Sequence, residues 1–133
     1  MNKIQIVDNP QMSVWFYPEQ GIIHSCMKGF CYGVDYRDAL MKGVETMKAH
    51  KAIKWLSDNR LGGAVPREDE EWGAKFWIPA ARASKWKHWG VVQPERVIGQ
   101  ISLKRLLKEH DNLGVNVRFF TDPDEAMKWL VEV

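Results

Sequence analysis

Polar side chains that could bind a ligand cluster where three of the expected strands end. The three strand segments are residues 52–57, 88–92 and 115–120. The candidate ligand-binding residues are Ser57, Asp58, Asn59, Arg60, Gln93, Arg96 and Thr121. Ligands of open α/β sheets bind outside the carboxyl ends of the strands, so we expect these residues to lie close together. Two arginines near a helix N-terminus would suit an anionic ligand.

A structural role accounts for the same residues without a ligand. Asp58 and Arg60 can pair with each other, Arg96 can stay solvated, and Asp122 can cap the helix that follows it. Structural uses of charge of this kind are common. Both interpretations therefore stay open at the level of sequence.

The remaining reactive side chains lack the spacing that metal or covalent chemistry requires. The histidines share no metal-binding spacing; they are His24, His50, His88 and His110. Cys26 and Cys31 are too few for a four-ligand zinc site, and neither has an activating partner in the sequence. We expect no metal, no cofactor and no catalytic residue, and we expect His110 to pack on an apolar helix face.

Residues 86–89 mix tryptophan, lysine and histidine, as surfaces that bind single-stranded nucleic acid do. However, 19 Lys and Arg stand against 17 Asp and Glu, a net charge of only +2. Domains that bind nucleic acid usually carry a basic excess on one face. We therefore interpret the segment as a basic helix end followed by a strand, and we expect no nucleic-acid partner.

The elements that must position these residues follow from turn signals and apolar spacing. Three short strands come first, and helices and strands then alternate. The strands are expected at 4–7, 14–17, 22–27, 52–57, 88–92 and 115–120, and the helices at 36–49, from 66, from 102 and from 122. The order β-β-β-α-β-α-β-α-β-α predicts one α/β domain over residues 1–133. It is a two-layer sandwich with a mixed, mostly parallel sheet after an N-terminal β-meander. Polar residues alternate with apolar ones in the strands, which favours helices mainly on one face.

Two of these helices carry specific expectations. The helix from Pro66 should bury one apolar face. The residues whose spacing forms this face are Trp72, Phe76, Ala80 and Ala83. Pro79 lies inside that pattern and should kink the helix. Ser102 is the expected N-cap of the next helix.

Composition limits the class of protein. Hydrophobic residues make up 45% of the chain and charged residues 27%, which is typical of a globular domain. The longest stretch without a charge is ten residues, well short of the roughly 20 apolar residues that cross a bilayer. The N-terminus has no apolar leader pattern, so we expect a cytoplasmic protein with no membrane insertion.

Four segments resemble a known family. They are residues 54–60 (KWLSDNR), 71–72 (EW), 77–80 (WIPA) and 119–122 (FFTD). With the order of elements, they are similar to small bacterial STAS-like proteins, which are related to anti-sigma-factor antagonists and grouped with Sec14-like folds. The resemblance covers nearly the whole chain. It implies an α/β sandwich of a mixed sheet with helices on one side, and it implies no particular activity.

One departure from the family concerns its phosphorylated serine. STAS antagonists carry that serine at the start of the helix after the central strand, whereas Ser57 lies at the strand end and the helix starts at Pro66. We therefore do not expect a kinase-regulated switch. The leading expectation is a non-catalytic protein-interaction or regulatory module, and the alternative is a binding protein for a small anionic or lipid-like ligand.

A homodimer is also expected. The chain carries seven tryptophans, which is many for 133 residues, and not all of them need fit inside. A strand at an open sheet edge tends to pair with another chain. The expected contact residues are Trp15, Phe16 and Tyr17.

Overall fold

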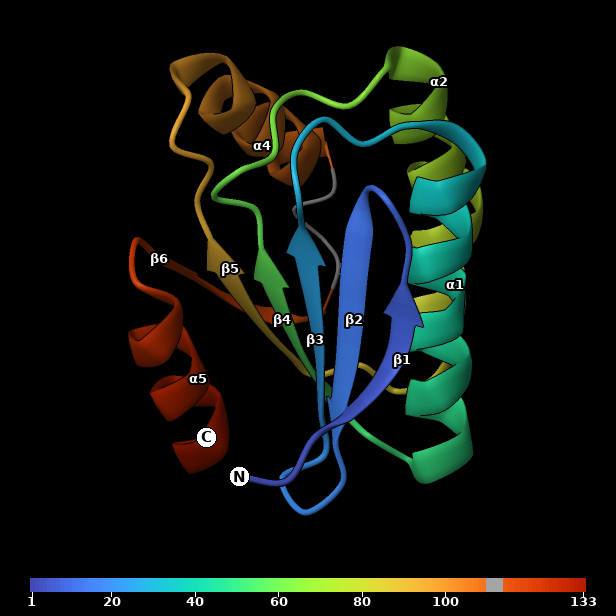
Figure 1. Cartoon of the computed structure of the whole chain (residues 1–133), viewed down its shortest axis with the longest axis vertical. Helices are drawn as coiled ribbons and strands as arrows, with labels where there is room; N and C mark the ends of the chain where they lie inside the picture. Colours follow the sequence, from blue (N-terminus) through green and yellow to red (C-terminus); the bar gives the residue numbers. More distant parts are fainter. Residues whose placement is uncertain (110–113) are drawn as a thin grey trace.

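A single six-stranded sheet lies at the centre of the computed structural model, which describes residues 1–109 and 114–133 (Figure 1). The strands are β1 (Ile4–Asp8), β2 (Met12–Tyr17), β3 (Ile22–Met27), β4 (Lys54–Asp58), β5 (His88–Val92) and β6 (Asn116–Phe120). The helices are α1 (Gly33–His50), α2 (Arg67–Trp72), the π-helical turn η1 (Gly73–Trp77), α3 (Ile78–Ala83), α4 (Val97–Glu109) and α5 (Pro123–Glu132). The expectation for His110 falls outside the described residues.

The strand order in the sheet follows the order in the sequence, β1 to β6. The first three strands form an antiparallel meander, and β3, β4, β5 and β6 run parallel. Each parallel step needs a crossover, which a helix supplies every time. The predicted α/β class and mixed sheet are confirmed.

Helices cover the two faces of the sheet unequally. α1 packs on β1, β2 and β3, and the helix formed by α2, η1 and α3 lies beside α1 on the same side (Figure 1). α5 packs on β4, β5 and β6 from the opposite side. Most of the helical cover is thus on one face, as the alternating strands predict, and α5 adds a layer over the parallel strands.

The main core is built around four tryptophans on the α1 side of the sheet. Trp55 and Trp89 come from β4 and β5, and their rings pack with those of Trp77 and Trp86 at centroid distances of 4.9 to 6.1 Å. The other three tryptophans are partly buried, so none of the seven is exposed. Because every tryptophan finds a place in the monomer, their number no longer argues for a dimer.

The helix from 67 to 83 differs from the expected α-helix with a kink at Pro79. A π-helical turn, η1, precedes the proline, and the helix continues without a break as α3. A π turn inserts an extra residue, so the face that meets the core shifts. Trp77, Ile78 and Ala81 are buried, whereas Phe76 is 59% exposed. The prediction that Phe76 and Ala83 lie on the buried face of this helix is therefore wrong.

Helix α4 begins five residues earlier than expected. Ser102 lies inside it, and its hydroxyl donates to Glu70 Oε1 at 2.8 Å instead of capping the helix. The expected start of α5 is confirmed, because Asp122 Oδ1 accepts a hydrogen bond from the backbone N–H of Asp124 at 2.9 Å.

Candidate functional site

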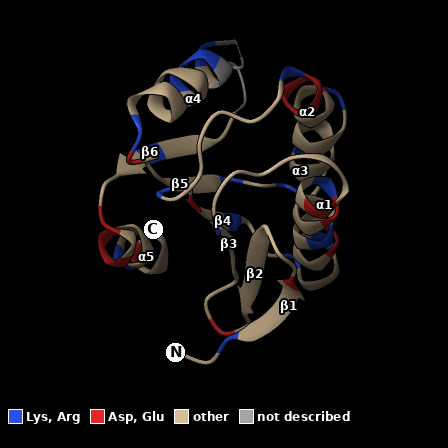
Figure 2. Cartoon of the chain, turned by 45° about the horizontal axis from the view of Figure 1, so that its top comes forward, with Lys and Arg blue, Asp and Glu red and all other residues tan. Residues whose placement is uncertain are grey.

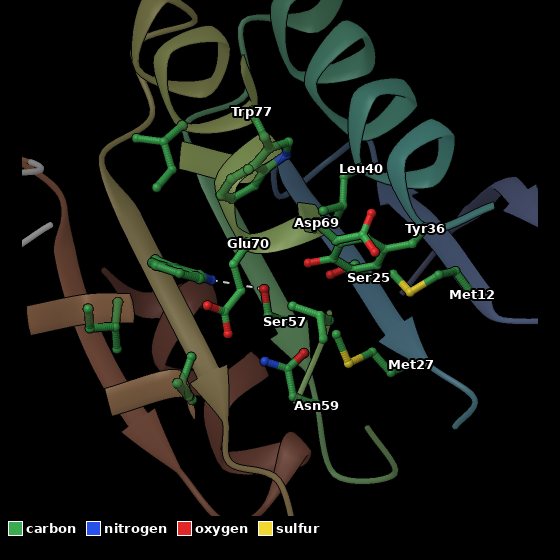
Figure 3. A pocket seen from close by; sticks show the side chains of 16 residues that line it. Met12, Ser25, Met27, Tyr36, Leu40, Ser57, Asn59, Asp69, Glu70 and Trp77 are labelled. Atoms are coloured by element: carbon green, nitrogen blue, oxygen red, sulfur yellow. Dashed lines mark hydrogen bonds between the residues drawn. The ribbon is translucent and has the colours of Figure 1, made fainter. Parts of the chain in front are cut away.

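A cavity of about 90 Å³ lies at the carboxyl ends of β3 and β4, and Trp89 of β5 also lines it. The sheet forms its floor, and α1, α2 and η1 form its walls (Figure 3). Leu103 and Leu107 bring α4 to the same cavity. The apolar part of the lining includes Met12, Met27, Leu40, Trp77, Leu103 and Leu107. A space of this size holds several waters, or part of a small organic molecule.

Two serines form the polar part of the floor. Ser25 on β3 and Ser57 on β4 are directly opposite each other in the parallel register, and both are buried. The indole N–H of Trp55 donates to Ser25 Oγ at 3.0 Å, and the indole N–H of Trp89 donates to Ser57 Oγ at 2.9 Å. Both bonds run from a tryptophan to the serine on the preceding strand, so one arrangement is repeated on neighbouring strands.

Tyr36 reaches into the same cavity from the first turns of α1 (Figure 3). Burial raises the pKa of its phenol well above the ordinary value, and the nearby Cys31, Asp69 and Glu70 raise it further. The phenol therefore keeps its proton at neutral pH. Within the described part of the chain the Tyr36 hydroxyl forms no hydrogen bond, so it remains a donor facing the cavity.

Consecutive acidic residues of α2 join that helix to its two neighbours. Asp69 is 2% exposed; its carboxylate accepts bonds from Arg37 Nε at 2.7 Å and from the backbone N–H of Gly33 at 3.2 and 3.3 Å. Gly33 has φ +66°, a conformation that favours glycine, and this turns its N–H toward Asp69. Asp69 thereby ties α2 to α1.

Glu70 makes the corresponding link to α4. Its carboxylate accepts hydrogen bonds from Arg105 at 2.8 and 2.9 Å and from the Ser102 hydroxyl at 2.8 Å. Figure 2 shows acidic colour at the start of α2 and basic colour on α4. Glu70 therefore holds the helix that covers the cavity, and both acids that line the cavity are matched by an arginine.

Of the residues expected to bind a ligand, the structure brings two into the cavity. Ser57 and Asn59 line it. Asp58 points to the other face of the sheet, where it is buried and binds Arg60 through bonds of 2.9 and 3.0 Å. The sequence left open whether Asp58 and Arg60 bind a ligand or pair with each other, and in the structure they pair with each other.

The other three predicted residues lie outside the cavity. Gln93 lines a separate depression of about 40 Å³ beside Leu103 and Phe119. Arg96 and Thr121 are exposed. Their strands do end at the same edge of the sheet, but the side chains turn away from the cavity.

The residues expected at a dimer contact do not lie on an edge strand. β2 is flanked by β1 and β3, and the sheet edges are β1 and β6. Phe16 and Tyr17 are 3% and 7% exposed, and Trp15 is partly buried against Lys3 and His24. Little of this segment is left to meet another chain, because its side chains already pack within the monomer.

The face of the sheet opposite the cavity holds a second group of polar side chains. Burial raises the pKa of the Cys26 thiol. Asp58, whose Oδ2 atom lies 3.9 Å from Cys26 Sγ, raises it further. Cys31 belongs instead to the main core on the α1 side of the sheet, where burial raises the pKa of its thiol to about 11. Both thiols are free and protonated at neutral pH, so neither is an activated nucleophile.

Sequence reasoning missed Ser25, Tyr36 and the clamping role of Glu70. Glu70 was interpreted only as a charge suited to a helix start. A signal was present for the serines, since each is the single hydroxyl residue in the second half of its strand. Their partners could not be deduced, because each indole comes from the next strand along the sheet.

Residues 86–89 are largely internal. Trp86 and Trp89 are 4% and 5% exposed, so their rings cannot stack on the bases of a nucleic acid. Over residues 1–109 and 114–133, no group of three or more His, Cys, Asp or Glu could hold a metal ion. Over the same residues, none of the helices has the length and apolar character to cross a membrane.

Comparison of the chain with known protein families, curated proteins and solved structures found no match. The resemblance to STAS-like proteins therefore remains a prediction that rests on the sequence segments quoted above.

Proposed function

We propose that this chain binds a small, largely apolar ligand in the cavity beneath α4. The observation that carries the proposal is the cavity itself. It combines apolar walls with a few polar groups aimed inward, which is the usual composition of a small-molecule site. Its position outside the carboxyl ends of parallel strands is where open α/β sheets bind ligands.

The polar groups of the cavity favour binding over a purely structural role. Ser25 and Ser57 are buried, and each retains a hydroxyl hydrogen that has no acceptor among the described residues. The indole N–H of Trp77, which also lines the cavity, is buried without a partner among the same residues. A buried donor without a partner costs free energy of about 1–3 kcal/mol, so such groups are normally matched by a ligand or by ordered water.

The proposal is tested by filling the cavity from α4. Leu103→Trp places a large ring in the space, whereas Leu61→Trp adds the same ring at a side chain that is 62% exposed and outside the lining. Small molecules of up to about eight heavy atoms are screened against each protein by NMR of the indole N–H signals. We expect saturable shifts of the Trp89 signal in the wild type and in Leu61→Trp, and none in Leu103→Trp. A screen with no binder to the wild type refutes the proposal.

A second function, the protein-interaction module, is favoured by a group of exposed apolar side chains that we call the apolar collar. Its members lie in the β3–α1 segment, the β4–α2 loop and the first turns of α4, all at the end of the molecule where the parallel strands finish (Figure 1). They are Phe30, Tyr32, Val34, Leu61, Val97, Ile98 and Ile101. Exposed apolar side chains gathered at one end are typical of a contact surface.

A further inference from the structure

The hydrogen-bond roles on the cavity floor restrict what a ligand can offer. An indole N–H can only donate, so Ser25 Oγ and Ser57 Oγ must act as acceptors toward Trp55 and Trp89. The hydrogen of each serine hydroxyl is then left to point elsewhere. Because the two serines are lateral neighbours on β3 and β4, their two O–H donors lie side by side.

Tyr36 adds a third donor to this arrangement. Its phenol lines the same cavity and forms no hydrogen bond within the described part of the chain. The floor and one wall therefore present hydroxyl donors. A molecule that satisfies them must carry an oxygen or nitrogen acceptor, and one carbonyl oxygen has two lone pairs with which to accept from two hydroxyls.

The charges around the cavity argue against an anionic acceptor. Asp69 and Glu70 both line it, and each carboxylate is already paired with one arginine, Arg37 or Arg105. These pairs leave no surplus cation in the lining. A third carboxylate would be placed beside two existing ones without a counter-charge, which is costly in a buried site.

We propose that the cavity binds an uncharged carbonyl compound, such as a ketone, ester or amide, with its carbonyl oxygen on the hydroxyls of Ser25 and Ser57. The carbon skeleton lies against the apolar side chains of the walls and of α4. The volume of about 90 Å³ is smaller than the roughly 150 Å³ that holds a benzene ring, so the buried part of the ligand is its carbonyl group and the carbons next to it. This inference rests on the proposed function, since it specifies the ligand class of the same cavity.

The test compares three probes of similar shape: cyclohexanone, methylenecyclohexane, which replaces the oxygen with a carbon, and cyclopentanecarboxylate, which carries a charge. Each is titrated into the wild-type protein, and its Kd is taken from the shifts of the Trp55 and Trp89 indole N–H signals. Methylenecyclohexane would leave the hydroxyls without acceptors, so we expect cyclohexanone to bind at least about tenfold more tightly. The carboxylate should bind more weakly than the ketone.

The outcomes separate this inference from the proposed function. Equal binding of cyclohexanone and methylenecyclohexane, or tighter binding of the carboxylate, overturns the carbonyl assignment and leaves an apolar ligand site standing. Absence of binding by all three probes counts against the cavity as a ligand site and removes both proposals.

Variants then locate the donors. Ser57→Ala should reduce the preference for the ketone, but it also leaves the buried Trp89 N–H without its acceptor and can destabilise the fold. Ser25→Ala tests the other serine in the same way. We expect each serine variant to weaken cyclohexanone binding several-fold and to leave methylenecyclohexane binding unchanged. Tyr36→Phe is the control, because it removes a cavity hydroxyl that the carbonyl oxygen does not use and should keep the preference for the ketone. A preference for the ketone that survives in both serine variants refutes the assignment of these hydroxyls.

Discussion

At the scale of single residues, the packing of Trp55 explains why position 43 of α1 is a glycine. A Cβ atom at Gly43 would collide with the Trp55 ring, which is fully buried beneath the helix. The same ring donates to Ser25 on the cavity floor. The close approach of α1 therefore fixes the position of the Trp55 indole. The N–H of that indole makes Ser25 Oγ a hydrogen-bond acceptor.

Gly43→Ala tests this contact. The better helix propensity of alanine is worth about 1 kcal/mol, but overpacking against Trp55 costs about 1–3 kcal/mol, so we expect a net loss of stability. Gly73→Ala is the matched control, because nothing lies within 4 Å of its Cβ position. Urea denaturation should show a lower midpoint for Gly43→Ala and an unchanged or higher one for Gly73→Ala. Equal midpoints would show that the Trp55 ring gives way freely.

His24 gives the fold a specific pH dependence. The pKa of His24 is lowered to about 4, mainly by burial; Asp58 opposes this shift, and Lys3 and Arg60 add to it. Its Nε2 atom is buried without a hydrogen-bond partner, and its Nδ1 atom lies 3.4 Å from the Tyr17 hydroxyl. A histidine with a depressed pKa stabilises the fold in its neutral form.

The stability due to His24 is therefore complete above pH 6.5 and is lost between pH 6.5 and about pH 4. Over that range the unfolded chain takes up the proton first, which reduces the free energy of unfolding by up to about 3 kcal/mol. His24→Gln should remove this part of the slope, as measured by urea denaturation at a series of pH values. An NMR titration of the wild type that places the His24 midpoint near 6.5 would contradict the expectation.

The limit of sequence reasoning at this scale is visible in the two serines. Ser57 was predicted because it ends a strand that precedes a loop, and the structure brings it into the cavity. Ser25 lies inside the neighbouring strand, two residues before its end, and its role depends on the parallel register that sets it opposite Ser57. The register of two strands that are far apart in the chain is a property of the folded sheet.

At the scale of elements, α2 holds its two neighbouring helices in place through adjacent side chains. Asp69 binds α1 and Glu70 binds α4, so a helix of only six residues sets the walls and the cover of the cavity. The sequence does predict an acidic helix start here, since carboxylates suit the positive end of the helix dipole. It does not predict that two of these carboxylates bind other helices, because those partners lie more than 30 residues away.

Glu70→Gln tests the attachment of α4. Glutamine keeps an oxygen that can accept from Ser102 but loses the charge that pairs with Arg105, an ion pair that is partly exposed. We expect the local opening of α4 to become easier by about 1 kcal/mol, seen as faster hydrogen exchange in that helix. Glu71→Gln is the control, since Glu71 pairs only with Arg67 of its own helix at the surface. Identical exchange in the two variants would show that Glu70 does not hold α4.

The π-helical turn shows why element interiors are harder to predict than element order. The spacing of Trp72, Phe76 and Ala80 fits an α-helix, and Pro79 predicts a kink in it, but neither feature predicts the extra residue that η1 inserts before the proline. The actual buried face follows from the cluster around Trp55 and Trp89, which Trp77 joins. Tertiary packing therefore overrides the local period in this segment.

At the scale of the whole molecule, one sheet separates two apolar layers of different size. The larger layer lies under α1 and the α2–α3 helix, and the smaller one lies under α5. The number, type and order of elements were predictable because turn residues mark them locally and crossover rules restrict their arrangement. The position of α5 on the opposite face was not, since a terminal helix has no following strand to fix its side.

The apolar collar leads to the last prediction, which concerns association of the chain with a second copy. A stable dimer buries about 800 Å² per partner, and the collar is the part of the described surface where exposed apolar side chains gather at one end. We expect light scattering at micromolar concentration to give the mass of two chains. Ile98→Glu places a charge in the collar and should restore the mass of one chain without changing the far-UV spectrum. Val131→Glu, at an exposed apolar side chain of α5, should leave the dimer intact.

Because the collar lies at the same end as the cavity, a dimer formed through it would also shield the bound ligand, and the Ile98→Glu variant should then release a probe such as cyclohexanone faster. A wild-type protein that has the mass of one chain at every concentration would exclude the collar as a contact between copies of this chain.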